Sequence, residues 1–339
     1  MSTVMASPRR STYQISVPNL GLDLMRATEA AAMAAGAWTG RGDPAAGDRA
    51  AHVAMREVLN EVTMNGFVII GETDHDTEGS GFTLQAGDRC GTGSGAPVDV
   101  AVDPVEGTVL LADGRSNAIS VIAASDRGTM YDPSVVTYME KLVVGADAAE
   151  AVDLDAPIAD TIVKVAKAKG VSAQDVTVGV LHRPRHEQLI SEIRATEAKI
   201  RLFNDGDVAM SIAAAEDGRS CDMMVGTGGS PEGVITACAM KAMDGTILAR
   251  LHPKDDEERE KAQEAGLTLD TVLSTDDLIN GGHTYFVATG ITDGDLLPGV
   301  RYFKGGTRTA SIVMRSRSGT VRHVESVHRT DKVGKHTQE

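Results

Sequence analysis

The sequence predicts an α/β protein, and three observations support this fold class. Of the 339 residues, 42% are hydrophobic but only 3% are aromatic and 36 are Gly, so we expect an aliphatic core with many tight turns. From about residue 156 onward, strand-like and helix-like segments alternate, which is typical of a parallel sheet with helices on both faces. The length allows a large core and favours two domains.

The first part of the chain predicts two helices followed by buried strands. Apolar residues recur with helical period in the first segment, and Gly and Pro in "TGRGDPAAGD" end it. The predicted helices cover residues 20–38 and 49–64, and the predicted strands cover residues 66–72, 98–103 and 116–125. A polar, Gly-rich loop or hairpin at residues 73–97 separates the first two strands.

The second part predicts the alternating region and three closing strands. Helices are expected at residues 157–169, 186–198, 207–215 and 231–243, with strands at 176–181, 199–203 and 223–226 between them. Acidic and basic residues alternate in residues 252–266, which favours a solvated helix. The final strands are expected at residues 283–290, 309–318 and 320–329.

Charge and cysteine usage exclude several classes of function. The formal net charge is −15, and no basic face is visible, so we expect no nucleic-acid partner. Three widely spaced Cys residues predict no disulfide framework, which favours the cytoplasm. No apolar run is long enough to cross a bilayer, so we expect no membrane partner. Residues 1–18 lack the apolar stretch of a secretory signal and are predicted to be a flexible extension.

Acidic residues accumulate where predicted elements begin or end. They are Asp48, Glu72, Asp103, Glu106 and Glu232. Mg²⁺ and Mn²⁺ prefer hard oxygen ligands, and several carboxylates must converge to hold them. The backbone carbonyl of Val105, between Asp103 and Glu106, is a further candidate ligand. Each acidic residue alone is more often a cap or a solvated turn, but five at such positions favour a metal site.

Other motifs favour phosphate and sugar binding. Gly107 and Thr108 precede a predicted helix, where free N–H groups bind phosphate, although the pair also fits a simple cap. Arg183 and Arg185 in "HRPRH" match phosphate oxygens, with surface solubility as the alternative. The "NDGDV" segment offers acceptors for hydroxyl groups, or a helix cap.

The sequence also argues against other chemistries. The "GTGGSPEG" segment lacks the GxGxxG spacing of dinucleotide-binding proteins. No nucleophile elbow and no HExxH pattern occurs, which disfavours serine and zinc hydrolases.

The ordered motifs "GRGD", "VDPVEGT", "SNAISV", "YMEKLVVG", "RPRH", "DGDV", "GGSPEGV", "ATGITDGDLL" and "MRSRSGTVR" span most of the chain. With them the sequence resembles the class II fructose-1,6-bisphosphatases of bacteria, whose relatives include fructose-1,6-/sedoheptulose-1,7-bisphosphatases. The resemblance implies a layered αβαβα fold of the sugar-phosphatase type. It also implies two or three Mg²⁺ or Mn²⁺ ions, a phosphorylated sugar as substrate, and a homo-oligomer, dimer or tetramer.

The resemblance assigns roles to residues at matching positions. Asp48, Glu72, Asp103, Glu106 and Glu232 would be metal ligands, and Thr108 with Asp76 would hold the attacking water. The residues that would bind the sugar and its retained phosphate are Tyr138, Arg183, Arg185, Asp205 and Asp207.

Two departures from the family pattern bear on substrate and rate. Pro44 replaces a Lys, and the loop after Glu72 is longer than in the family, with Asp74 or Glu78 as substitutes for Asp76.

The predicted division is a metal- and phosphate-binding domain at 19–155, a sugar-binding domain at 156–330 and a tail at 331–339. We therefore expect a fructose 1,6-bisphosphatase. The alternatives are a bisphosphatase for a heptulose or octose bisphosphate, a catalytically impaired regulatory homologue, and a broad-specificity monophosphatase.

Overall fold

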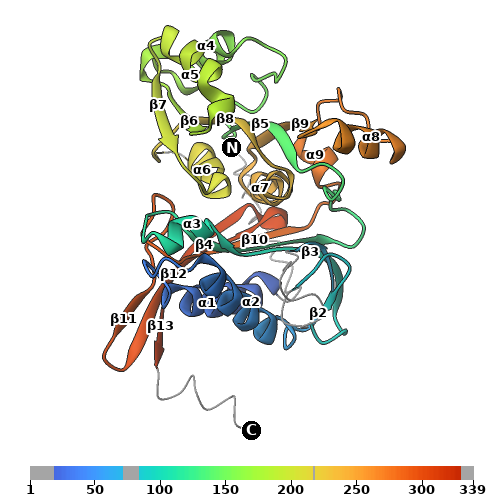
Figure 1. The fold of residues 1–339 in the computed structure, drawn as a ribbon, viewed down its shortest axis with the longest axis vertical. Coiled ribbons are helices and arrows are strands. Elements are labelled where there is room, and N and C mark those ends of the chain that lie inside the picture. Colours follow the sequence, from blue (N-terminus) through green and yellow to red (C-terminus); the bar gives the residue numbers. More distant parts are fainter. Residues whose placement is uncertain (1–18, 72–83, 217, 330–339) are drawn as a thin grey trace, which may run out of the picture.

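The computed structural model describes residues 19–71, 84–216 and 218–329 and consists of five layers (Figure 1). Two β-sheets lie one above the other, with helices between them and on both outer sides. Three separate clusters of buried apolar side chains fill the spaces between the layers. The arrangement confirms the predicted αβαβα fold of α/β class.

The larger sheet has eight strands in the order β11-β12-β10-β4-β3-β1-β2, with β13 paired to β12. It is mostly antiparallel, and only β1 and β3 run parallel. The strands are β1 (Met64–Ile70), β2 (Arg89–Cys90), β3 (Ala96–Glu106), β4 (Ile119–Asp126), β10 (Thr284–Gly290), β11 (Arg301–Phe303), β12 (Gly306–Arg315) and β13 (Thr320–Arg329).

The smaller sheet has five strands in the order β7-β6-β8-β5-β9. They are β5 (Tyr138–Val144), β6 (Thr177–Leu181), β7 (Lys199–Phe203), β8 (Met223–Gly229) and β9 (Thr246–His252). The alternating pattern predicted a parallel sheet, and β6, β7 and β8 are parallel. Strand β5, which precedes residue 156, runs antiparallel to both of its neighbours, β8 and β9, and neither β5 nor β9 was identified from the sequence.

The helices are α1 (Leu20–Gly36), α2 (Pro44–Leu59), α3 (Thr108–Ala112), α4 (Ile158–Lys169), α5 (Glu187–Ala195), α6 (Asp207–Ala215), α7 (Ser230–Met243), α8 (Asp256–Glu264) and α9 (Thr275–Leu278). In Figure 1, α1 and α2 cover the outer face of the larger sheet, and α4 and α5 cover the smaller sheet. Helices α6 and α7 lie between the sheets, and most of their residues are buried. A helix that is apolar all round requires such a position.

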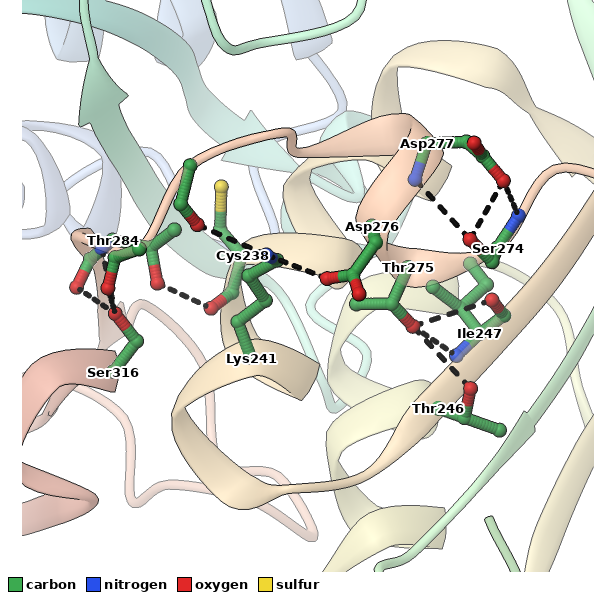
Figure 2. A network of polar contacts seen from close by, with 12 residues as sticks. Cys238, Lys241, Thr246, Ile247, Ser274, Thr275, Asp276, Asp277, Thr284 and Ser316 are labelled. Atoms are coloured by element: carbon green, nitrogen blue, oxygen red, sulfur yellow. Dashed lines mark hydrogen bonds and ion pairs between the residues drawn. The ribbon is translucent and has the colours of Figure 1, made fainter. Parts of the chain in front are cut away.

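The carboxyl end of α7 is attached to the larger sheet and to α9 by polar contacts (Figure 2). Thr284 of β10 donates its hydroxyl hydrogen to the carbonyl of Cys238 at 3.2 Å. Lys241 donates to the carbonyl of Gly281 at 2.9 Å and pairs with Asp276 at 2.7 Å. These contacts fix the orientation of α7, and therefore the position of its first turn.

The start of α2 differs from the prediction. The helix was expected from residue 49 because Gly and Pro precede it, but it begins at Pro44. Proline suits the first helical position because no N–H is needed there, and the Asp43 side chain caps the helix by accepting the N–H of Ala46 at 2.9 Å. Asp48 therefore lies inside a helix instead of in a turn.

The charged helix α8 is mostly exposed, as predicted, and two of its residues, Glu258 and Ala262, are buried. The Glu258 carboxylate accepts the N–H and the hydroxyl hydrogen of Thr137 at 3.1 and 2.5 Å. This carboxylate fastens α8 to the residue that precedes β5.

The two sheets do not divide the chain at residue 155. The strand β5, from the first predicted domain, belongs to the smaller sheet, and the strands after residue 284 return to the larger sheet. In the described part of the chain, no helix is long and apolar enough to cross a membrane.

All three thiols are predicted to be unreactive in the folded protein. Burial raises the pKa of Cys90 to about 11 and the pKa values of Cys221 and Cys238 to about 12. We expect no labelling by Ellman's reagent at mildly alkaline pH, and labelling of all three after unfolding. Rapid labelling of any of them in the native protein would contradict the packing described here.

Candidate active site

The segment containing Asp103 and Glu106 ends β3 irregularly. Pro104, which has no N–H, lies between them, and the register of β3 against β4 shifts here. Gly107 follows with a φ of 91°, a conformation that strains any residue with a Cβ, and Thr108 begins α3. This turn ends the strand abruptly and leaves Glu106 facing the first turn of α6.

Glu106 is a buried carboxylate, 5% exposed. Its Oε1 atom accepts the N–H of Val208 in α6 at 2.7 Å. Burial raises the pKa of Glu106 well above its usual range, and the charges of Asp207, Glu232 and Asp205 raise it further, while the bond from Val208 opposes the shift. The charged form of Glu106 thus needs additional positive charge nearby.

A divalent cation would suit this carboxylate. Oε2 of Glu106 is buried and has no hydrogen-bond partner among the described residues. A bound Mg²⁺ or Mn²⁺ ion would use that oxygen as a ligand and would favour the charged form. Within the described residues, no three His, Cys, Asp or Glu side chains lie close enough together to hold a metal. Glu72, a predicted ligand, lies outside those residues.

A buried ion pair lies beside Glu106. The Lys141 side chain is 1% exposed, and its Nζ atom donates to Oδ2 of Asp207 at 2.6 Å. Sequence analysis did not identify Lys141, although a signal was present. On β5 it alternates with Met139 and Val143, which are both buried, so the pattern places a charged residue on an apolar face.

Two glycines at the end of β8 make room for these carboxylates. A Cβ atom on Gly228 would lie 2.3 Å from Oδ2 of Asp207 and 3.1 Å from Nζ of Lys141. A Cβ atom on Gly229 would lie 1.9 Å from Oε2 of Glu232, in the first turn of α7. The "GTGG" segment therefore permits close approach of side chains to the strand, a role that the sequence analysis did not assign to it.

The Arg185 guanidinium lies over the ring of Tyr138, with 5.1 Å between its Cζ atom and the ring centre. Arg185 also donates from Nε and Nη2 to the carbonyl of Thr227 on β8, at 3.1 and 2.8 Å. These contacts hold Arg185 against the strand from which Gly228 and Gly229 continue.

His186, also from the basic segment after β6, has a structural role. Its Nδ1 and the carbonyl of Leu181 lie 2.6 Å apart, and its Nε2 accepts the N–H of Thr227 at 2.7 Å. Since Nε2 is the acceptor, Nδ1 carries the proton, and burial lowers the pKa of His186 further below its usual value. The ring therefore joins β6 to β8 in its neutral form.

Asp205 lies at the turn before α6. Arg183 faces it at 3.9 Å, and Gly206 follows with a φ of 85°. Burial is the main cause that raises the pKa of Asp205, and the charge of Asp207 adds to it. Asp205 and Asp207 thus bring two further carboxylates to the Glu106 region.

The remaining predicted residues are distributed around this region. Asp48 faces His52 at 3.7 Å in α2, which packs against α3, and Thr108 is half-buried at the start of α3. The Val105 side chain is buried. Asp76, like the residues that could substitute for it, lies outside the described residues.

Comparison with known proteins identifies the family. The family described as "Bacterial fructose-1,6-bisphosphatase, glpX-encoded" matches residues 18–328. The chain is 40% identical over 329 residues to the fructose-1,6-bisphosphatase class 2 of Haemophilus influenzae, covering 93% of this chain and 98% of that protein. It is 37% identical over 326 residues to fructose-1,6-bisphosphatase 1 class 2 of Escherichia coli K12, covering 92% and 96%.

These matches extend over nearly the whole chain and include every element that contributes to the carboxylate cluster. The chain belongs to the glpX-encoded family of class 2 bacterial fructose-1,6-bisphosphatases.

Proposed function

We propose that the chain is a metal-dependent phosphoric monoester hydrolase that removes the 1-phosphate of fructose 1,6-bisphosphate. Membership of the family supports the reaction. The observation that carries the proposal is the buried carboxylate of Glu106, whose free oxygen and raised pKa suit a cation at the junction of β3, α6 and α7.

The proposed metal ligands are those that the motifs predict: Asp48, Glu72, Asp103, Glu106, Glu232 and the carbonyl of Val105. When bound, two or three Mg²⁺ or Mn²⁺ ions would neutralise the charge of the phosphate and lower the pKa of a bound water. The acidic chain, with a net charge of −15, would otherwise repel a bisphosphate.

The proposed roles of the turn after β3 concern the scissile phosphate. The Thr108 hydroxyl, with Asp76, positions the water in line with the ester bond. The N–H groups of Gly107 and Thr108 donate to phosphate oxygens as negative charge accumulates on them. The sharp turn at Gly107 supports this proposal because α3 starts directly after it, and the first N–H groups of a helix have no partner within the helix.

The proposed sugar site lies at the ends of β5, β6 and β7. Asp205 and Asp207 accept hydrogen bonds from sugar hydroxyls, and Lys141 holds the Asp207 carboxylate in one orientation. Arg183 and Arg185 bind the retained phosphate, with Tyr138 supporting the Arg185 guanidinium. These arginines would thus offset the electrostatic repulsion between the acidic chain and the second phosphate of the substrate.

The direct test is phosphate release by the purified chain. With Mg²⁺ or Mn²⁺ we expect release from fructose 1,6-bisphosphate, at a higher kcat/KM than from fructose 6-phosphate or from heptulose and octose bisphosphates. Loss of activity with a chelator and recovery on metal addition would establish metal dependence. No release from fructose 1,6-bisphosphate with any divalent metal would contradict the proposal.

Glu106→Gln should remove turnover and preserve the fold. The amide cannot supply the charged ligand oxygen, so we expect kcat to fall by at least about a hundredfold, as for loss of a group that acts in the transition state. Glu260→Gln, on the exposed side of α8, is the matched control. Near-normal metal-dependent kcat in Glu106→Gln would exclude Glu106 as a ligand.

Arg185→Ala should separate bisphosphate from monophosphate substrates. Loss of a charged hydrogen-bonding partner is expected to raise KM for a bisphosphate by about tenfold or more, with little change for a monophosphate. Arg259→Ala, an exposed arginine of α8, serves as the control. Equal changes in KM for both substrates would show that Arg185 does not bind the second phosphate.

The effects on stability of substituting Lys141 and Asp207 should be strongly non-additive. Asp207→Asn leaves a buried ammonium group without its partner and should cost about 3–5 kcal/mol of stability. The double variant Asp207→Asn/Lys141→Met should recover most of the loss in melting temperature. It should still bind the sugar weakly, because the Asp207 carboxylate remains absent. Normal KM in the stable double variant would limit the pair to a structural role.

A further inference from the structure

One buried carboxylate lies outside the proposed metal and sugar sites, that of Glu258 in α8. Glu258 is 7% exposed, although most residues of this helix are exposed. Its Oε2 atom accepts the N–H of Lys254, just before its own helix, at 2.8 Å. Its Oε1 atom accepts the N–H and the hydroxyl hydrogen of Thr137 at 3.1 and 2.5 Å. The side chain is therefore held at both oxygens and connects α8 to the segment before β5.

These three hydrogen bonds require a carboxylate at this position. All three partner groups are donors, and each carboxylate oxygen faces at least one backbone N–H. Burial alone would raise the pKa of Glu258, but the hydrogen bonds from Thr137 and Lys254 together lower it below its usual value. A glutamine amide would have to turn its NH₂ group toward a backbone N–H, so one bond would be lost in either orientation.

The residue that Glu258 holds is joined to two elements of the proposed site. Tyr138, which follows Thr137, begins β5 and lies under the Arg185 guanidinium. The carbonyl of Thr137 accepts the N–H of Ser230, the first residue of α7, at 2.9 Å. The position of Thr137 therefore affects both the start of β5 and the first turn of α7.

The first turn of α7 depends on this contact with Thr137. The first N–H groups of a helix need partners outside the helix. Here the N-cap residue, Gly229, has no side chain to accept them, and Pro231 has no N–H at all. The bond from Ser230 to Thr137 thus holds the beginning of the helix. Glu232 follows two residues later and packs against Gly229, so a displaced first turn would move its carboxylate.

We propose that Glu258 is a positioning residue for the metal site. Through Thr137 it fixes the first turn of α7, and with it the carboxylate of Glu232. This inference rests on the proposed function, in which Glu232 is a metal ligand. Groups that orient a metal ligand contribute about tenfold to a hundredfold to metal affinity or activity, and Glu258 would do so without touching the metal or the substrate.

The test is titration of the full chain with Mn²⁺ in the absence of substrate, followed by the electron paramagnetic resonance signal of the free ion. Glu258→Gln should raise the dissociation constant of Mn²⁺ by about tenfold. Thr137→Val, which removes only the hydroxyl group from the contact, should raise it by a smaller factor. In the double variant the two effects should be less than additive, because both substitutions break the same contact.

Assays of phosphate release distinguish positioning from a general effect on the fold. At a temperature well below unfolding, Glu258→Gln should lose activity at limiting Mn²⁺ and recover most of its kcat at saturating Mn²⁺. A residue that only stabilised α8 would lower the melting temperature without changing the Mn²⁺ concentration that gives half-maximal activity. Glu260→Gln, on the exposed side of the same helix, is the control and should bind Mn²⁺ like the wild type.

Unchanged Mn²⁺ affinity in Glu258→Gln would overturn the inference, as would an equal loss in Glu260→Gln. If Glu258→Gln does not fold, Thr137→Val at an exposed residue provides the same comparison, and unchanged Mn²⁺ affinity there would overturn the inference. A wild type that binds Mn²⁺ more tightly than the variants but releases no phosphate would contradict the proposed function while supporting the positioning role of Glu258.

Discussion

The site depends on a single constraint, the convergence of buried and partly buried carboxylates at one junction between the two sheets. Glu106, Asp205, Asp207 and Glu232 influence one another electrostatically, and like charges in a place of low water access are unfavourable. The buried ammonium group of Lys141 compensates one of these charges through its bond to Asp207. The raised pKa of Glu106 indicates that further positive charge is needed. The proposed divalent cation would supply that charge.

The fold produces the junction by aligning the ends of separate elements. Helices α6 and α7 lie in the apolar layer between the sheets, and both begin beside the end of β8. Gly228 and Gly229 permit the first turns of these helices to approach that strand closely. Further along α7, Cys238 and Lys241 hold the helix, so the position of Glu232 depends on contacts about two turns away.

Much of this architecture can be predicted from the sequence, because hydrophobic periodicity and turn residues are local properties of the chain. The helices α4, α6 and α7 and the strands β6, β7 and β13 lie close to their predicted bounds. The missed strands β5 and β9 depend on partners that are distant in sequence. The acidic residues were selected by their predicted positions at element ends, which holds for Glu106 and Glu232 but not for Asp48, inside α2. Lys141 was missed because its partner Asp207 is distant in sequence. Likewise, Glu258 lies in a charged run and is buried by a contact with Thr137 that no local pattern encodes.

The most direct test of the central claim is a crystal structure of the protein soaked with Mn²⁺, with the metal located by anomalous scattering. The account predicts a peak at about 2.1 Å from the carboxylate of Glu106, the usual distance for oxygen ligands of such ions. It also predicts that the ammonium group of Lys141 remains bonded to Asp207. Mn²⁺ bound elsewhere in the molecule, with none at Glu106, would contradict the account.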